Sequence, residues 1–350
     1  MLLAVFGVWE CRQEAAKSLE DAGLHLASHA ANRGSNPLGD AKKVQGLPVT
    51  ITGSPFSLVQ KQGCLCMLEE FYKFKPFSEY LIKELCGGDI YYSPPESFND
   101  PLDCSPVVTP DVHGNDLQEL YHRIISHQFG EEAVKQKLQT IYQQLEEHER
   151  PYPYQSYLEL YMYDGILKAI KMPFSSYGVL SLTSRYNSPL MWSHYADQHR
   201  GVCIKYKLVD HVGIRPEKVE YTRPRSISAQ DILEWIRLDP ENFNEKIKPF
   251  YFFSKAEEWK YENEWRCLSE TSGVNSCPFK IASILFGIRC SYAVMRTIVG
   301  LLYPKHPDIE YYRMKPVDGG FDLEPEARDP EEIMRELPRQ SVLLAFPPFP

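Results

Sequence analysis

Three charged residues occupy alternate positions in one short segment: Glu262, Glu264 and Arg266. Aromatic or apolar residues fill most of the other places in residues 259–267. Because side chains two apart lie on the same face of a β-strand, the pattern predicts one polar face that carries all three charges. Two carboxylates so close repel each other, and one pKa rises unless a cation such as Arg266 neutralises them.

This polar face has two interpretations. A carboxylate placed there can bind a ribose hydroxyl or stabilise a developing positive charge, which makes Glu264 and Glu262 candidate catalytic residues. Alternatively, the charges lie on an exposed strand face and pair with charged neighbours, a common way to stabilise a sheet. The pattern by itself leaves both interpretations open.

A second candidate group lies just after Ser188 and Pro189, which are typical of a helix start. The helix is expected to end before Gly201, a typical residue after a helix end. Helical periodicity predicts a buried stripe comprising Met191, Trp192, Tyr195 and Ala196. His194 and Asp197 then lie on another face, and His194 is a candidate general acid or base. The alternative is a surface histidine beside an aspartate.

A third group stands on a turn that Pro101 makes rigid: Asn99, Asp100 and Asp103. Their oxygens can contact a ligand, or the turn can simply order its own backbone through its side chains. A hard metal ion needs more oxygen ligands than the sequence places here, so no metal site is predicted. A metal-dependent nuclease built on Asp100, Asp103 and His194 is the least favoured interpretation.

A fourth group is Tyr72 and Lys73 on an expected early strand. The tyrosine can stack on a flat ring and the lysine can meet a phosphate. The sequence contains no G-x-x-x-x-G-K-[ST], G-x-G-x-x-G, G-x-S-x-G or H-E-x-x-H motif. These absences argue against the usual nucleotide-binding folds, α/β-hydrolases and zincin proteases.

Charge and cysteine usage restrict the class of protein. The formal net charge is -9, so a basic field able to displace counterions from phosphate is missing, and strong nucleic-acid binding is not expected. The nine cysteines are odd in number and include no C-x-x-C pair, which favours free thiols in a reducing cytoplasm. No run reaches the ~18 apolar residues of a membrane span. We therefore expect a cytoplasmic protein without membrane attachment.

The expected elements alternate without a repeating order, which predicts an α+β fold with a central mixed or antiparallel sheet and flanking helices. A helical insertion is expected at about residues 115–172. Strands are expected at 68–74, 89–93, 178–183, 202–208, 259–267, 280–286 and 309–314, and further helices at 78–85, 189–196, 231–256 and 293–302.

The composition divides the chain into three parts. Residues 1–66 contain a stretch rich in Gly, Pro, Ser and Asn, and they read as a poorly structured or accessory leader. Residues 67–323 form the predicted domain. Residues 324–350 are acidic and interrupted by prolines, which is typical of a solvated tail.

Taken in order, the motifs resemble the bacterial family called domain of unknown function 2971. The resemblance covers about residues 72–323, and its most specific blocks are M-W-S-H-Y at 191–195 and E-x-E-W-R at 262–266. The other matching pieces are 72–74, 90–93, 98–101, 180–183, Gly201, 219–221, Lys255, Trp259 and 284–287. The resemblance implies an α+β fold and a bacterial origin, and it implies no particular activity.

A second pattern resembles mono-ADP-ribosyltransferases, which combine an early basic or aromatic residue, a middle Ser-Thr-Ser-like strand and a late Glu-x-Glu. The resemblance implies an ADP-ribosyltransferase-like fold. It gives those roles to Tyr72 and Lys73, to Ser181, Thr183 and Ser184, and to Glu262 and Glu264. The predicted NAD contacts are Tyr72, Lys73, Ser181, Thr183, Trp192, Arg266, Asn99 and Asp100, and the predicted catalytic residues are Glu264, Glu262 and His194.

The leading hypothesis is therefore an NAD-consuming ADP-ribosyltransferase or NAD glycohydrolase of toxin or phage-defence type. NAD is then a substrate rather than a permanently bound cofactor, and the acceptor is an unidentified protein or nucleic acid. The alternative is a non-catalytic ligand- or protein-binding module that uses the same cleft. A homodimer through an exposed aromatic patch also stays open.

Overall fold

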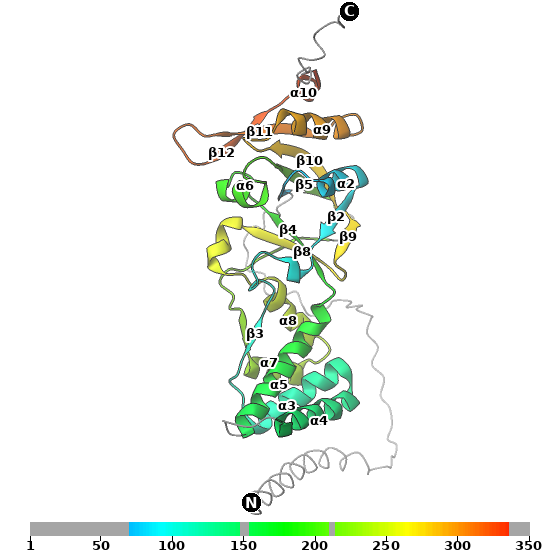
Figure 1. The fold of residues 1–350 in the computed structure, drawn as a ribbon, viewed down its shortest axis with the longest axis vertical. Helices are drawn as coiled ribbons and strands as arrows, with labels where there is room; N and C mark the ends of the chain where they lie inside the picture. The colour runs from blue at the N-terminus through cyan, green and yellow to red at the C-terminus, as the bar shows by residue number, and fades with distance from the viewer. Residues whose placement is uncertain (1–69, 148–153, 210–213, 336–350) are drawn as a thin grey trace, which may run out of the picture. The chain divides into compact units, whose positions relative to one another are not determined.

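One mixed sheet of eight strands organises the fold, in the order β12-β11-β10-β5-β1-β4-β8-β6 (Figure 1). The computed structural model describes residues 70–147, 154–209 and 214–335, so the predicted leader lies outside the described residues. Strands β10 and β11 are parallel, and the other neighbouring pairs are antiparallel. This sheet and its helices confirm the predicted α+β class.

The elements have the following bounds. The main sheet contains β1 (Glu70–Lys75), β4 (Gly178–Thr183), β5 (Val202–Leu208), β6 (Glu217–Lys218), β8 (Glu264–Ser269), β10 (Phe279–Phe286), β11 (Glu310–Pro316) and β12 (Leu323–Ala327). Two small sheets pair β2 (Asp89–Tyr92) with β9 (Gly273–Ser276), and β3 (Val107–Thr109) with β7 (Ser226–Ser228). The α-helices are α2 (Glu79–Gly87), α3 (Gly114–Phe129), α4 (Glu131–Glu147), α5 (Tyr154–Lys171), α6 (Pro189–Tyr195), α7 (Ala229–Leu238), α8 (Phe243–Phe252), α9 (Tyr292–Leu302) and α10 (Pro330–Arg335). Short 3₁₀ helices are η1 (Pro95–Ser97), η2 (Met172–Phe174) and η3 (Glu257–Glu262).

Both faces of the central strands are buried because helices contribute to a core on each side. On β5, Val202, Ile204 and Tyr206 face a hydrophobic cluster shared with α2 and α9. Cys203, on the opposite face, lies in a second cluster shared with α6. The predicted alternation of residues 202–208 is confirmed, and removing both faces from water stabilises this part of the sheet.

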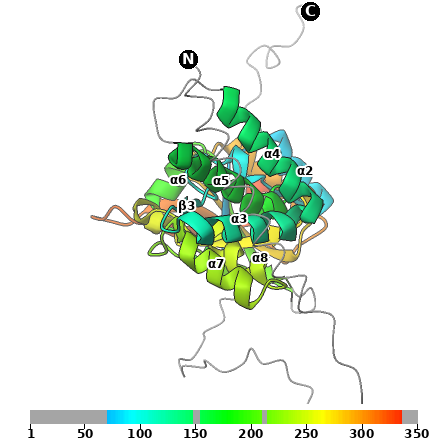
Figure 2. The ribbon, with the colours of Figure 1, turned by 90° about the horizontal axis from the view of Figure 1, so that it is seen from below.

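The helical insertion expected at residues 115–172 is present as α3, α4 and α5, which pack on one another (Figures 1 and 2). Helices α7 and α8 contact them and complete a third hydrophobic cluster. On α3, Leu117, Leu120 and Ile124 are fully buried, as their helical spacing predicts. Helix α8 ends at Phe252, whose backbone carbonyl reaches the site described below.

The sheet splits between β1 and β4. Strand β1 pairs with β5 along all six of its residues, but it meets β4 at a single register pair, Tyr72 with Thr183. Strand β4 instead pairs with β8 along its whole length. Beyond the Tyr72–Thr183 pair the two halves of the sheet therefore diverge, and the gap between them is where the candidate site lies.

The strand predicted for residues 259–267 is half wrong. Residues 257–262 form η3, and Asn263 adopts a left-handed backbone with φ of 46° before β8 begins at Glu264. Local hydrogen bonds, such as Trp259 N–H to the Ala256 carbonyl, replace the strand pairing. An alternating pattern cannot reveal this turn, because it records side-chain polarity and not backbone pairing.

Helix α6 and the C-terminal region also differ from expectation. The helix begins as predicted, with the Ser188 hydroxyl accepting from Met191 N–H, but it ends at Tyr195 and is followed by three left-handed residues, 197–199. The segment assigned to an acidic tail contains β12 and α10. Ile333 of α10 is fully buried in the cluster shared with α9, so the folded domain continues at least to Arg335.

Candidate functional site

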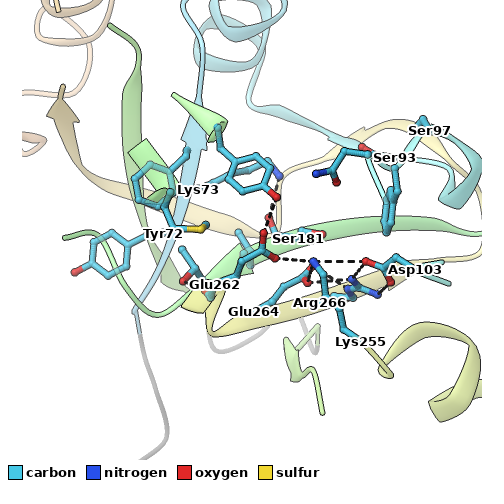
Figure 3. A pocket seen from close by; sticks show the side chains of 17 residues that line it. Tyr72, Lys73, Ser93, Ser97, Asp103, Ser181, Lys255, Glu262, Glu264 and Arg266 are labelled. Carbon is cyan, nitrogen blue, oxygen red and sulfur yellow. Dashed lines mark hydrogen bonds and ion pairs between the residues drawn. The ribbon is translucent and has the colours of Figure 1, made fainter. Parts of the chain in front are cut away.

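The gap between β1 and β4 opens into a pocket of about 320 Å³ (Figure 3). Eight of the residues predicted from the sequence line it: Tyr72, Lys73, Asn99, Ser181, Thr183, Glu262, Glu264 and Arg266. The other lining residues are Phe74, Ser93, Ser97, Phe98, Asp103, Leu182, Met191, Tyr195 and Lys255. Segments far apart in the chain therefore meet around one cavity, which both polar and apolar side chains line.

Strand register aligns three of the predicted residues across the split. Tyr72 of β1 pairs with Thr183 of β4, and Thr183 pairs with Glu264 of β8. The convergence that the sequence hypothesis requires is therefore present in the fold. The hydroxyl of Thr183 also donates to the backbone carbonyl of Glu262 at 2.5 Å, which holds η3 against this line of residues.

Arg266 is the buried centre of a charge cluster and is only 1% exposed. Its guanidinium donates to both oxygens of Glu264 at 2.8 and 2.9 Å, and to both oxygens of Asp103 at 3.0 and 2.6 Å. One further N–H reaches the Phe252 carbonyl at 2.7 Å. These contacts use all five donors of the side chain. Arg266 was predicted to contact NAD, but it has no donor left for a ligand and instead positions the two carboxylates.

Lys255 is a site residue that the sequence analysis did not select. Its ammonium donates to Glu262 at 2.6 Å and to Glu264 at 2.9 Å, and it lies 3.5 Å from Asp103 (Figure 3). Burial lowers the pKa of Lys255, but these carboxylates outweigh it, so the pKa lies above its ordinary value. The sequence analysis included Lys255 among the residues that resemble the family, but its spacing did not indicate that it bonds both glutamates.

The carboxylates of Glu262 and Glu264 differ in the number of hydrogen bonds that they accept from the protein. Burial raises the pKa of Glu264, but Arg266 and Lys255 more than offset that effect and lower it to about 2. Its carboxylate accepts two bonds from Arg266 and one from Lys255, and the nearby Ser181 hydroxyl adds to the lowering of the pKa. Glu264 is therefore ionised and bonded to two cations.

Glu262 accepts only two described bonds, one on each oxygen. The Tyr195 hydroxyl donates to Oε1 at 2.5 Å, and Lys255 donates to Oε2 at 2.6 Å. Burial and then this bond to Glu262 raise the pKa of Tyr195, so the phenol keeps its proton and remains a donor. About two acceptor positions of Glu262 stay available to a molecule in the pocket.

The model of a protein family of unknown function, DUF2971, matches residues 191–267. The match runs from α6 to β8 and includes Tyr195, Lys255, Glu262, Glu264 and Arg266, so the resemblance expected from the sequence is confirmed over this segment. No curated protein and no solved structure matches the chain, so these comparisons do not support the resemblance to mono-ADP-ribosyltransferases.

Four predicted site residues lie outside the lining of the pocket. Ser184 is one of them, and its hydroxyl accepts from the Asn263 side chain. Trp192, in the DUF2971-matching segment, is fully buried, and its indole N–H donates to the Tyr186 carbonyl, so it belongs to the core. Asp100 accepts from Leu102 N–H and from the Trp259 indole, which orders its own turn. His194 is exposed and contacts aromatic rings rather than the charged cluster. Asp100 therefore orders its own turn, and His194 is a surface residue outside the charged cluster.

Within residues 70–147, 154–209 and 214–335, neither a metal site nor a membrane-spanning helix is found. No cluster of three or more His, Cys, Asp or Glu side chains there is placed to bind a metal ion. No helix in the same ranges is both long and apolar enough to cross a membrane.

Lys73 enters the pocket from β1 and donates to the Ser181 carbonyl at 2.9 Å, across the split in the sheet (Figure 3). Among the described residues, no carboxylate lies within ion-pair distance of its amine. Burial, followed by the nearby charge of Lys75, lowers the pKa of Lys73 to about 8. The side chain is thus a cation at neutral pH whose charge is not cancelled by a direct partner.

We expect the Lys73 amine to titrate near pH 8 in the folded protein, well below the ordinary lysine value of 10.5. Between these values the unfolded chain binds the proton and the folded chain does not, so folding stability from this group increases with pH through that window. NMR of ¹³C-methylated lysines measures the midpoint, and a Lys73→Arg variant assigns the signal. Lys83, an exposed lysine on α2 whose pKa is raised, is the internal comparison. A Lys73 midpoint shared with Lys83 would contradict the prediction.

Proposed function

We propose that the pocket cleaves the nicotinamide–ribose bond of NAD and transfers the ADP-ribose to water or to an acceptor. The observation that carries the proposal is the alignment of Tyr72, Thr183 and Glu264 beside Glu262 around one cavity. Breaking an N-glycosidic bond builds positive charge on the ribose, as in glycoside hydrolysis, and a fixed carboxylate stabilises that charge.

Glu262 is the carboxylate that we assign to the reacting sugar. It lines the pocket, has one cation, Lys255, bonded to it and retains acceptor capacity, whereas Glu264 is bonded to both Arg266 and Lys255. In this arrangement Lys255 and Tyr195 hold the Glu262 oxygens in place before the substrate arrives. A preorganised group needs little rearrangement when charge develops, which is the main source of electrostatic catalysis.

The charge balance of the cluster favours a cationic transition state. Three acidic side chains (Asp103, Glu262 and Glu264) surround two basic ones, Lys255 and Arg266. One negative charge is therefore in excess, and in a buried site it is screened less than in water. The uncancelled Lys73 cation is available to the diphosphate of the substrate.

A specific observation favours a second candidate function, the non-catalytic binding module. The bonds from Arg266 to Glu264, Asp103 and the Phe252 carbonyl occupy every donor of Arg266, as a purely structural cluster would. In that case the pocket binds a ligand with Glu262 and Lys73 as its polar contacts and releases it unchanged.

One experiment separates the two functions. Purified protein is incubated with NAD, released nicotinamide is measured by chromatography, and NAD binding is measured by calorimetry. Release of nicotinamide supports the enzyme, whereas binding of unchanged NAD supports the module. If the protein neither binds NAD nor releases nicotinamide, with or without cell lysate as a source of acceptor, the NAD proposal is wrong.

A further inference from the structure

Four aromatic side chains of the DUF2971-matching segment form a continuous row, in the order Trp259, Tyr261, His194 and Tyr195. The ring centroids of successive members are 6.0, 6.5 and 6.2 Å apart. Trp259 and Tyr261 belong to η3, and His194 and Tyr195 belong to α6. We call this set the aromatic row.

The aromatic row borders the pocket at both ends. Tyr195 lines the cavity and donates to Glu262, while Tyr261 is next to Glu262 in the chain. At the other end, the ammonium of Lys255, which also lines the pocket, lies 5.2 Å from the centre of the Trp259 ring. The rings are half-buried except for His194, which is exposed. A molecule too large for the pocket can therefore contact these rings beside it.

The size of the pocket requires such an extension for a dinucleotide. Its volume of about 320 Å³ lies at the lower end of the range for small-molecule sites, about 300–1,000 Å³. A dinucleotide has two flat bases joined by two riboses and a diphosphate. If the nicotinamide riboside half occupies the pocket beside Glu262, the second base must lie outside it.

We propose that the aromatic row binds the adenine ring of the dinucleotide by stacking, while the pocket holds the nicotinamide riboside half. This inference rests on the proposed function and names a second subsite for the same substrate. Aromatic side chains bind a base through its π-face, with no need for hydrogen bonds to its edge. His194 then contributes to binding, in place of the acid–base role expected from its sequence.

The test compares NAD with nicotinamide mononucleotide, which has the same scissile bond but lacks the adenylate half. Stacking on one aromatic side chain is worth about 5- to 150-fold in affinity by alanine substitution. Tyr261→Ala is therefore expected to raise KM for NAD within that range and to leave KM for the mononucleotide unchanged. Trp259→Ala also removes a contact of Lys255, so it is expected to raise KM for NAD more than KM for the mononucleotide. Tyr80→Ala, at a 79% exposed tyrosine of α2, is the matched control and should change neither value.

Binding of AMP by calorimetry makes the outcome independent of catalysis. If AMP binds and Tyr261→Ala or Trp259→Ala weakens it, the aromatic row is supported even when no nicotinamide is released, and only the proposed reaction fails. If nicotinamide is released but KM for NAD is unchanged in both variants, the row is not the adenine subsite and the reaction stands. Equal increases of KM for both substrates, or no AMP binding by the wild type, also overturn the row.

Discussion

Glu262→Gln is expected to slow nicotinamide release from NAD about 10²–10³-fold, the usual cost of removing one preorganised electrostatic contact. Glutamine keeps the size of the side chain and removes its charge. The excess negative charge of the cluster then disappears, because two acidic side chains would face Lys255 and Arg266. Steady-state nicotinamide release at saturating NAD measures the effect as a loss of kcat.

Glu257→Gln is the matched control for this prediction. Glu257 lies on the same 3₁₀ helix, η3, but its side chain is 72% exposed and, among the described residues, forms an ion pair only with Lys260. We expect this variant to keep the wild-type rate. Thermal unfolding of both variants separates lost chemistry from lost structure. A Glu262→Gln protein that is folded and as active as the wild type would remove Glu262 from the reaction and leave the assignment of the carboxylate to Glu264.

Arg266→Met is expected to destabilise the protein by about 3–5 kcal/mol, the cost of breaking one side of a buried ion pair. Methionine fills much of the same volume but leaves Asp103 and Glu264 buried with Lys255 as their shared cation. The Phe252 carbonyl at the end of α8 also loses its donor. Urea unfolding at neutral pH, followed by circular dichroism, measures the change in the free energy of unfolding.

The matched control is Arg237→Met, which removes an arginine that also bonds two acidic side chains, Asp116 and Glu119. That cluster lies at the surface, where solvent screens the charges, so its loss should matter far less. The double variant Arg266→Met/Glu264→Gln should be less unstable than the two single changes added together, since it removes one of the stranded charges. Equal unfolding midpoints for Arg266→Met and Arg237→Met would show that the buried cluster does not stabilise the fold.

Local pattern reading succeeded where a neighbouring residue in the chain determines the geometry. The pairing of Glu264 with Arg266 follows from their i, i+2 spacing on β8, and the buried face of α6 follows from helical periodicity. The same reasoning placed Glu262 on a strand, where the structure has η3 and a left-handed Asn263. Glu262 still reaches the pocket, because Thr183, Tyr195 and Lys255 hold it there through contacts distant in sequence.

Residues whose importance comes from long-range contacts were missed or misjudged. Lys255 stands seven positions before Glu262, a spacing that matches neither a strand nor a helix period. It reaches Glu262 because the 3₁₀ helix η3 lies between the two residues. Trp192 has the residue type of a ligand contact, yet it is fully buried in the core. Asp103 was a candidate ligand contact on its turn and part of the least favoured metal-dependent interpretation. Its carboxylate instead accepts hydrogen bonds from both terminal nitrogens of Arg266, 163 positions away.

The amino-acid sequence alone determined the α+β class, the helical insertion, most strands and the identity of the acidic motif, because these depend on periodicities of two or 3.6 residues. Tertiary structure alone decided that β1 and β4 part after one register pair and leave a cavity between them. It also decided which glutamate is bonded to two cations and which to one. The split in the sheet is bridged by Lys73 and Ser181, 108 positions apart, and Glu262 is held by Tyr195, 67 positions away. No local pattern encodes distances between segments so far apart in the chain.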